Sequence, residues 1–388
     1  MTLRHIFVPL LSAFSLLFSV MGIAKADTAQ NMQKLAYHGD RLFIVDADGT
    51  LWKTSPLFGE EKLESAITAT AVGENVLSVI ADANLFIIDR NNTLWDWGNP
   101  ETGKGTLLSG RFASLSIPEK RPVKIMDGII SAAVNERVVL ALHRDGSVWA
   151  WGHADATRGD NLPGTFNRPR RILDNVNILV HSGDHVLALK KDGSLWTWGN
   201  NDCGGLGDGT FMNRYRPAAL SAERFRGKRI VNISAHRTES IALTEDGTFW
   251  YWGLDMNLRG QCTDMPDNEP QSLMRADEPE EGTSPSATPL PAPENIIALQ
   301  YANQNAVYLL DDQHILYNWD GQKIASRVAA FAVSNTFHNE DLALLKTDGT
   351  VWIKDTGQPD DYLSGPLFLP VTFSGKTRQM SPGSSRIP

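Results

Sequence analysis

The stretch DGSLWTWGNN, from Asp192 to Asn201, places two tryptophans two residues apart directly after an Asp-Gly pair. Residues i and i+2 of a β-strand project to the same side of a sheet, so Trp196 and Trp198 share one environment if this stretch is a strand. An Asp-Gly pair favours a tight hairpin turn because glycine tolerates a positive φ. The stretch therefore predicts a turn followed by a strand with one aromatic face.

The same phrase occurs seven times in the chain. All 11 tryptophans fall inside its copies, although the links between the copies vary in length. The other copies are DADGTLWKTS at Trp52, DRNNTLWDWG at Trp95, HRDGSVWAWG at Trp149, TEDGTFWYWG at Trp250, DDQHILYNWD at Tyr317 and KTDGTVWIKD at Trp352. A constant phrase between variable links is typical of loops on a repeated scaffold.

A short apolar run precedes each copy, as in VLALK before Asp192. An apolar run, a turn signal and a second run of β-branched and aromatic residues together predict a β-hairpin. In two copies the turn departs from Asp-Gly, to Asn91-Asn92 and, most weakly, to Gln313-His314. Each of the seven sheet units is too small to bury its apolar faces alone. Packing the units face to face around an axis buries these faces. We therefore expect an all-β fold, a seven-bladed β-propeller.

The fullest copy, from Gly183 to Thr210, reads GDHVLALKKDGSLWTWGNNDCGGLGDGT. This pattern resembles the repeat of the regulator of chromosome condensation family, and the resemblance extends over essentially all the chain after residue 30. It implies a seven-bladed propeller, and we expect His185 to be a structural residue that bonds across a blade junction. Gly193 is expected to be structural because it supplies the hairpin turn. The tryptophans expected to pack between blades as structural residues are Trp52, Trp95, Trp149, Trp196, Trp198, Trp250 and Trp352.

The first 26 residues differ from the rest. Residues 1–26 have a basic start, a long apolar stretch and an Ala-Lys-Ala sequence at the end. This pattern predicts a cleaved secretory signal and a secreted or periplasmic protein, and an uncleaved membrane anchor is the alternative. We expect the propeller over residues 30–375, a disordered acidic and proline-rich insertion over residues 276–295, and a flexible tail over residues 376–388.

Charge narrows the choice of partner. The formal net charge is -9 at pH 7, and the chain has no basic run. Nucleotide-exchange and nucleic-acid functions of the nuclear members would need a nuclear address and a surface suited to phosphates. We therefore expect no nucleic-acid partner.

Two cysteines, Cys203 and Cys262, both follow a Trp-Gly pair, in consecutive units. They either form a disulfide at the rim between neighbouring blades or remain two separate thiols. Their spacing and neighbours do not suggest a metal site.

DADG at Asp46 begins like a calcium loop, but other copies replace Asp46 with lysine, threonine or histidine, which favours an ordinary turn. We expect neither metal nor cofactor.

No pattern of catalytic residues is visible in the sequence. We therefore expect a non-enzymatic, monomeric binding scaffold for a protein partner or a cell-surface polymer. A propeller enzyme or sugar-binding module acting on an extracellular polysaccharide is the alternative, and a secreted enzyme inhibitor is a minor one. The links after Trp-Gly carry the diversity, so we place the binding face there. The residues expected on or near this face are Asn201, Arg214, Tyr215, Asp255 and Arg259.

Overall fold

The structure is a computed structural model. It describes residues 34–38, 41–57, 67–81, 85–98, 122–135, 137–153, 155–253, 271–273, 295–303, 306–318, 321–333, 342–354 and 368–374. The expected signal, most of the 276–295 insertion and the tail lie outside these residues. No helix within the described ranges is long and apolar enough to cross a membrane.

The described strands form six antiparallel or mixed sheets, and short 3-10 helices interrupt two of the links. Five sheets have four strands each, in chain order from one edge to the other. These are β5 (Val76–Ala81), β6 (Leu85–Asp89), β7 (Leu94–Gly98) and β8 (Val123–Met126); β9 (Ile129–Val134), β10 (Val138–His143), β11 (Val148–Gly152) and β12 (Phe166–Leu173); β13 (Val176–His181), β14 (His185–Lys190), β15 (Leu195–Gly199) and β16 (Arg214–Ala219); β17 (Ile230–His236), β18 (Glu239–Thr244), β19 (Phe249–Trp252) and β20 (Gln271–Leu273); and β21 (Ile296–Asn303), β22 (Ala306–Asp311), β23 (Leu316–Asn318) and β24 (Lys323–Ala325). The 3-10 helices are η1 (Ala156–Arg158) and η2 (Ala222–Phe225).

The sixth sheet joins the two ends of the chain. It contains β1 (Leu35–His38), β2 (Arg41–Val45), β3 (Leu51–Thr54), β4 (Ile67–Gly73), β25 (Val328–Val333), β26 (Leu342–Lys346), β27 (Val351–Lys354) and β28 (Phe368–Phe373). The outer strands β4 and β28 pair in parallel, with Thr68 opposite Thr372. The all-β propeller is present, but the expectation of seven separate blades is corrected: the structure has five separate four-stranded blades, because this pairing merges the other eight strands into one sheet.

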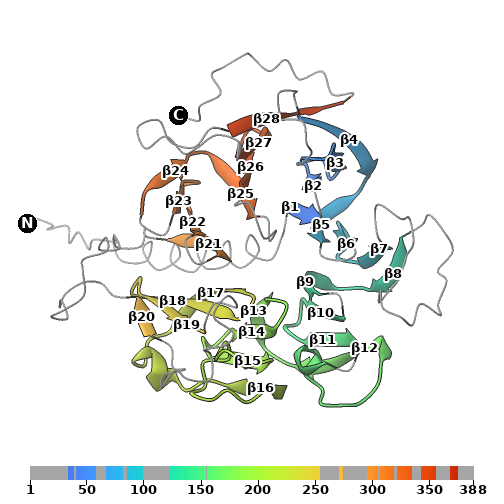
Figure 1. Cartoon of the computed structure of the whole chain (residues 1–388). Coiled ribbons are helices and arrows are strands. Elements are labelled where there is room, and N and C mark those ends of the chain that lie inside the picture. Colours follow the sequence, from blue (N-terminus) through green and yellow to red (C-terminus); the bar gives the residue numbers. More distant parts are fainter. Residues whose placement is uncertain are drawn as a thin grey trace, which may run out of the picture.

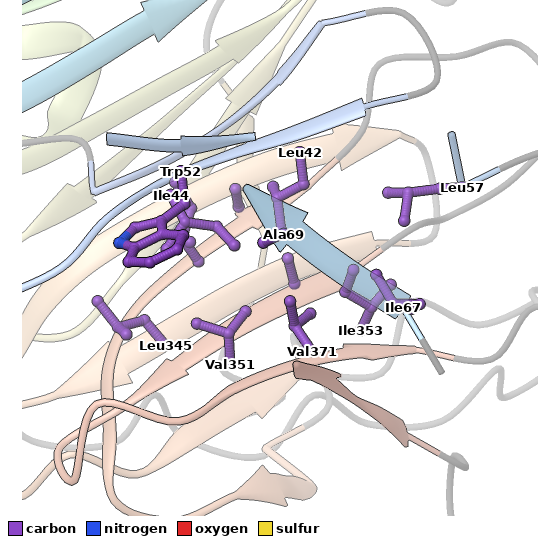
Figure 2. Packing of buried hydrophobic residues seen from close by; sticks show 13 residues of the cluster. Leu42, Ile44, Trp52, Leu57, Ile67, Ala69, Leu345, Val351, Ile353 and Val371 are labelled. Atoms are coloured by element: carbon purple, nitrogen blue, oxygen red, sulfur yellow. The ribbon is translucent and has the colours of Figure 1, made fainter. Parts of the chain in front are cut away.

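The sheets surround a common centre, as Figure 1 shows, and the last strands lie beside the first. The innermost strands of consecutive repeats contact one another from β1 to β25, and β25 contacts β1. Apolar residues fill the space between neighbouring repeats. Figure 2 shows the cluster that joins the chain ends, in which Trp52 and Ile44 face Leu345 and Val351.

Each repeat turns in the same way between its second and third strands. In the first, the Gly49 amide donates to the Asp46 carbonyl and the Asp46 amide donates to the Thr50 carbonyl. Gly49 has φ +85° and Gly193 has φ +86°, a left-handed conformation that favours glycine. In the weakest copy His314 takes that place with φ +65°. All seven phrases therefore form the turn, including the two copies in which Asn92 and His314 take the place of glycine.

The first aromatic residue of each phrase fastens its own turn. Trp52 donates from Nε1 to Asp46 Oδ2 at 3.0 Å, while Asp46 Oδ1 accepts from the amides of Asp48 and Thr50. The carboxylate of Asp46 is thus used by the turn itself. Equivalent bonds join Trp95 to Asp89, Trp149 to Ser147, Trp196 to Ser194, Trp250 to Thr244, Tyr317 to Asp311 and Trp352 to Thr350.

The antiparallel order of the strands gives the propeller two different ends. The "Asp-Gly end" carries the hairpin turns at residues 46–50, 89–93, 143–147, 190–194, 244–248, 311–315 and 346–350. The "Trp-Gly end" carries the links after the third strands, of which residues 153–165 and 200–213 are described apart from residue 154.

Candidate functional site

The second tryptophan of a phrase binds the link of the preceding repeat. Trp198 is fully buried, and its Nε1 donates to the carbonyl of Thr157 at 2.7 Å. One repeat later, Trp252 Nε1 donates to the carbonyl of Gly205 at 2.8 Å. Trp151 is also fully buried, but its Nε1 has no partner among the described residues, and the preceding link, residues 99–121, lies outside them. Two links of the Trp-Gly end are therefore fixed to the next blade.

Glycines allow this close approach. A Cβ on Gly159 would lie 2.8 Å from Nε1 of Trp198, and a Cβ on Gly207 would lie 2.7 Å from Nε1 of Trp252. Both glycines also have a positive φ. Gly207 ends the stretch GGLG of residues 204–207, so this stretch shapes the link around the indole of Trp252.

His185 contacts the serine that binds the second of these links. Its Nε2 lies 2.6 Å from Oγ of Ser240 in the next blade, and its Nδ1 lies 3.0 Å from Oγ of Ser182. Ser240 in turn donates to the carbonyl of Gly205. Burial lowers the pKa of His185 to about 3, with a smaller contribution from His181. The imidazole is thus neutral and structural at neutral pH, at the junction between two blades.

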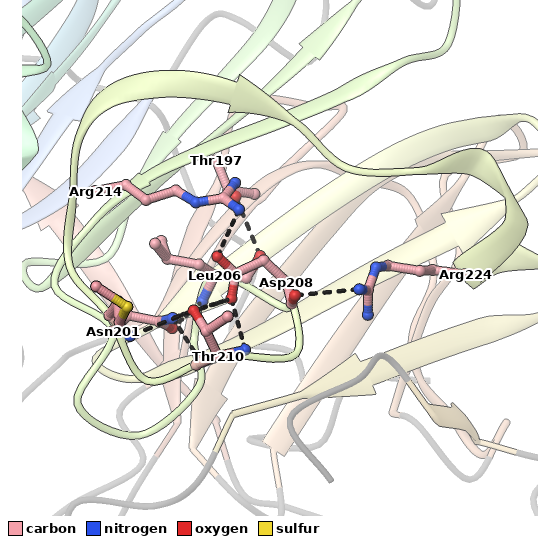
Figure 3. A network of polar contacts seen from close by, with 8 residues as sticks. Thr197, Asn201, Leu206, Asp208, Thr210, Arg214 and Arg224 are labelled. Carbon is pink, nitrogen blue, oxygen red and sulfur yellow. Dashed lines mark hydrogen bonds and ion pairs between the residues drawn. The ribbon is translucent and has the colours of Figure 1, made fainter.

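The link over residues 200–213 is organised by its own polar groups (Figure 3). Asn201 donates to the carbonyl of Thr210 at 2.6 Å and accepts from the amide of Leu206 at 3.0 Å. Asp208 pairs with Arg214 at 2.7 Å, and its carbonyl accepts from Arg224. These bonds hold the link in one conformation before any partner arrives.

The link over residues 153–165 uses a buried cation instead. Asp155 caps η1 by accepting from the amide of Thr157. Arg158, which is fully buried, pairs with Asp160 at 2.9 Å and donates to the carbonyls of Gly152, Leu162 and Gly164. A guanidinium suits this position because it has five donors in a fixed planar arrangement. Arg158 therefore organises the link and is not exposed to a partner.

Apolar side chains are exposed on these two ordered links and on the first residues of the adjoining strand β16. Among the described residues, five large hydrophobic side chains are exposed, and three of them lie here: Leu162, Met212 and Tyr215. Met212 is 74% exposed and Tyr215 is 48% exposed. Exposed aromatic and methionine side chains on a rigid base are typical of protein interfaces.

The residues expected on the binding face have different positions. Tyr215 is exposed, and the side chain of Arg214 is partly exposed while it pairs with Asp208. Asn201 is buried and contributes only by shaping the link. Asp255 and Arg259 lie outside the described residues, so their placement stays a prediction.

Cys203 is buried and takes part in a disulfide bond. The chain has two cysteines, and Cys262 lies outside the described residues, so the pairing of the two also stays a prediction.

Sequence reasoning missed several residues of this region. Arg158 reads as an ordinary polar loop residue, although the glycine that follows it was a signal of a tight helix end. Ser240 and Met212 carry no sequence signal, because their roles depend on the neighbouring blade and on exposure. No group of three or more histidine, cysteine or acidic side chains that could hold a metal ion occurs within the described part of the chain.

Comparison with known proteins identifies the repeat. The family model of the Regulator of chromosome condensation (RCC1) repeat matches residues 192–243. The E3 ubiquitin-protein ligase HERC2 of Mus musculus is 27% identical over 197 residues, which cover 49% of this chain and 3% of HERC2. The human HERC2 matches to the same extent. The matched part is thus a small fraction of those relatives.

Solved propellers share the fold. Prp20p from Saccharomyces cerevisiae, reported with its binding properties to Gsp1p and histones, has a TM-score of 0.51 and 18% identity, covering 75% of this chain and 71% of Prp20p. Human WBSCR16 has a TM-score of 0.53 and 13% identity, covering 78% of this chain and 84% of WBSCR16. At these identities the likeness establishes the architecture alone.

Proposed function

We propose that this chain, which belongs to the proteins built on the regulator of chromosome condensation repeat, is an exported, non-catalytic scaffold that binds a protein partner through its Trp-Gly end. The observation that carries the proposal is the pair of ordered links that expose Leu162 and Met212, together with Tyr215 exposed on the adjoining strand β16. A surface that is already ordered loses little conformational entropy on binding. Such a surface suits recognition without any chemical step.

The proposed scaffold has seven repeats. The eight-stranded sheet holds two repeats of four strands, each with its own hairpin turn and first aromatic residue, at Trp52 and Trp352. Their outer strands pair instead of remaining separate edges. Counting these two with the five separate blades gives a seven-bladed ring whose closure lies between β4 and β28.

Related propellers support a binding role. Prp20p was reported with binding properties to Gsp1p and histones, and yeast RCC1 (Prp20) was solved with Kap60 bound. The partner of this chain differs from those, because the first 26 residues favour export and the net charge of -9 disfavours phosphate-rich targets. The proposed location is the periplasm or the extracellular space.

Site-specific cross-linking tests the proposal. The full chain is produced with its own leader, and p-benzoylphenylalanine replaces Met212, or Lys191 on the Asp-Gly end as the matched control. We expect a protein adduct from Met212 in intact cells and none from Lys191. Equal adducts from both positions, or adducts from Lys191 alone, would show that the Trp-Gly end is not the binding face.

Two further measurements test export and the polysaccharide alternative. Mass spectrometry of the mature chain from the envelope fraction should show a first residue near Asp27. A cytoplasmic chain that retains residues 1–26 contradicts export. A glycan array with the full chain should give no signal that depends on Tyr215, whereas saturable glycan binding lost in Tyr215→Ala would favour the sugar-binding alternative.

A further inference from the structure

The outer strands β12 and β16 concentrate arginine. They read FNRPRRIL and RYRPAA, and together hold five arginines and no acidic residue. The whole chain, in contrast, has a formal net charge of -9. β12 and β16 are the outer strands of neighbouring blades and contact each other, so the arginines lie along two adjacent blade edges.

Only two of the five arginines are neutralised. Arg171 pairs with Asp174 at 2.6 Å, and Arg214 pairs with Asp208 at 2.7 Å. The remaining three are exposed and have no acidic partner among the described residues: Arg168, Arg170 and Arg216. Asp160, in the link before β12, pairs with the buried Arg158.

Protection of the sheet edge does not account for this concentration. Charged side chains and prolines do prevent strands from adding to an exposed edge, and Pro169 and Pro217 already lack the amide that such pairing needs. The outer strands β8, β20 and β24 of the other separate blades hold at most one basic residue each. Blades with the same exposed edge thus manage without arginine clusters.

The surrounding side chains favour a protein ligand. The guanidinium of Arg170 lies 3.7 Å from the centroid of the Phe166 ring, a contact that orients it at the surface. Tyr215 lies on β16 between Arg214 and Arg216 in the sequence, and Met212 lies two residues before that strand begins. Arginine, tyrosine and methionine together are the composition of a protein interface, whereas a phosphate or sulfate polymer needs only the cations.

We propose that Arg168, Arg170 and Arg216 form a docking surface, with Tyr215 as its apolar anchor, for an acidic segment of the protein partner. This inference rests on the proposed function and names the chemistry of the partner on the same side of the blades. Guanidinium groups bind carboxylates through two parallel hydrogen bonds, which lysine cannot do. The prolines direct the segment to bind through side chains instead of by strand addition.

The test uses the full mature chain and defined probes. Fluorescence anisotropy measures binding of a fluorescein-labelled peptide, Glu-Glu-Leu-Glu-Tyr-Glu-Glu-Leu, and of its matched glutamine version. The variant R168Q/R170Q/R216Q removes the three free cations. The control R144Q/K191Q/R229Q removes three exposed cations, two in turns of the Asp-Gly end and Arg229, which donates to the carbonyl of Lys191 there, so both variants carry the same net charge.

We expect the arginine variant to weaken peptide binding about 20-fold or more, Tyr215→Ala about 5-fold, and the control less than about 2-fold. Thermal melting verifies that each variant is folded. Equal losses in both triple variants, or equal binding of the glutamine peptide, would overturn the proposal. A heparin fragment or polyphosphate that binds the three arginines more tightly than the peptide would also overturn it, in favour of an anionic polymer.

Cross-linking separates this inference from the proposed function. If the Met212 adduct with the native partner persists in R168Q/R170Q/R216Q, the scaffold role stands and the acidic-segment inference fails. If the adduct is absent in wild type while the peptide binds through the three arginines, the inference about ligand chemistry holds and the proposed face is wrong.

Discussion

The two ends of the propeller use similar residues for different purposes. At the Asp-Gly end, each turn binds an aromatic residue of its own repeat, as Asp46 binds Trp52 across six residues. At the Trp-Gly end, an indole binds a different repeat, as Trp198 binds Thr157 across 41 residues. The polar groups of the Asp-Gly end are paired within one repeat, whereas the Trp-Gly end depends on bonds between neighbouring repeats.

This difference separates structural from variable surface. Local bonds make the Asp-Gly turns uniform, and a uniform surface cannot distinguish one partner from another. At the Trp-Gly end, buried indoles bind backbone carbonyls of the links. Exposed side chains such as Met212 and Tyr215 take no part in these bonds, so they can be replaced without loss of the fold. The following predictions test this division.

Trp198→Ala should have the largest effect. The change removes a fully buried indole between two blades, and we expect the free energy of unfolding to fall by about 3 to 5 kcal/mol. Trp198→Phe keeps most of the apolar contact but loses the bond to Thr157, and should lower it by about 1 to 2 kcal/mol. Urea denaturation measures both. A neutral Trp198→Ala variant would mean that the second tryptophan does not fasten the Trp-Gly end.

Reduction of the disulfide should lower stability almost as much. If Cys203 pairs with Cys262, the closed loop of about 60 residues predicts a loss of about 4 kcal/mol on reduction. The comparison is urea denaturation of the exported protein with and without reductant. Two free thiols titrated in denatured, unreduced protein would rule out the bridge and leave the link held by its hydrogen bonds alone.

His185 should make stability depend on pH. Its pKa is lowered to about 3 in the folded chain by burial, against about 6.5 when unfolded. The unfolded chain therefore binds more protons between these values, so this contribution is complete above about pH 6.5 and is lost as the pH falls. At pH 5 the loss is about 2 kcal/mol. Urea denaturation measures the free energy of unfolding at pH 7.5 and at pH 5.0. The decrease between these two pH values should be smaller in His185→Gln than in the wild type by about 2 kcal/mol. Identical differences in both proteins would contradict the buried neutral imidazole.

Asp89→Asn should have the smallest effect, because it disturbs one turn only. Asp89 accepts from the amides of Asn91 and Thr93 and from Nε1 of Trp95, and an amide nitrogen facing the indole would replace the last acceptor. We expect a loss of about 1 kcal/mol. A double-mutant cycle with Trp95→Phe isolates the bond. A coupling energy near zero would show that the turn is fixed by its backbone alone.

Much of the fold was predictable because the turns are encoded locally. The αL positions and the strands on either side follow from Asp-Gly pairs and apolar runs a few residues long, and even His314 adopts the left-handed conformation. The binding residues were harder to predict. Tyr215 and Asn201 are both expected on or near the binding face; Tyr215 is exposed, whereas Asn201 is buried and its side chain is used inside its link. The sequence does not distinguish an asparagine whose amide faces water from one whose amide donates to a carbonyl nine residues away, as that of Asn201 does.

The repeating unit, its hairpin turn and the aromatic residue that binds this turn can be predicted from the amino-acid sequence, because they depend on sterics and hydrogen bonds within about ten residues. How the repeats join depends on contacts between residues far apart in the chain. The parallel pairing of β4 with β28, the contact of His185 with Ser240 and the contact between β12 and β16 all bring together residues from different repeats. Links of variable length separate those residues, and their meeting is set by the packing of whole blades around the ring.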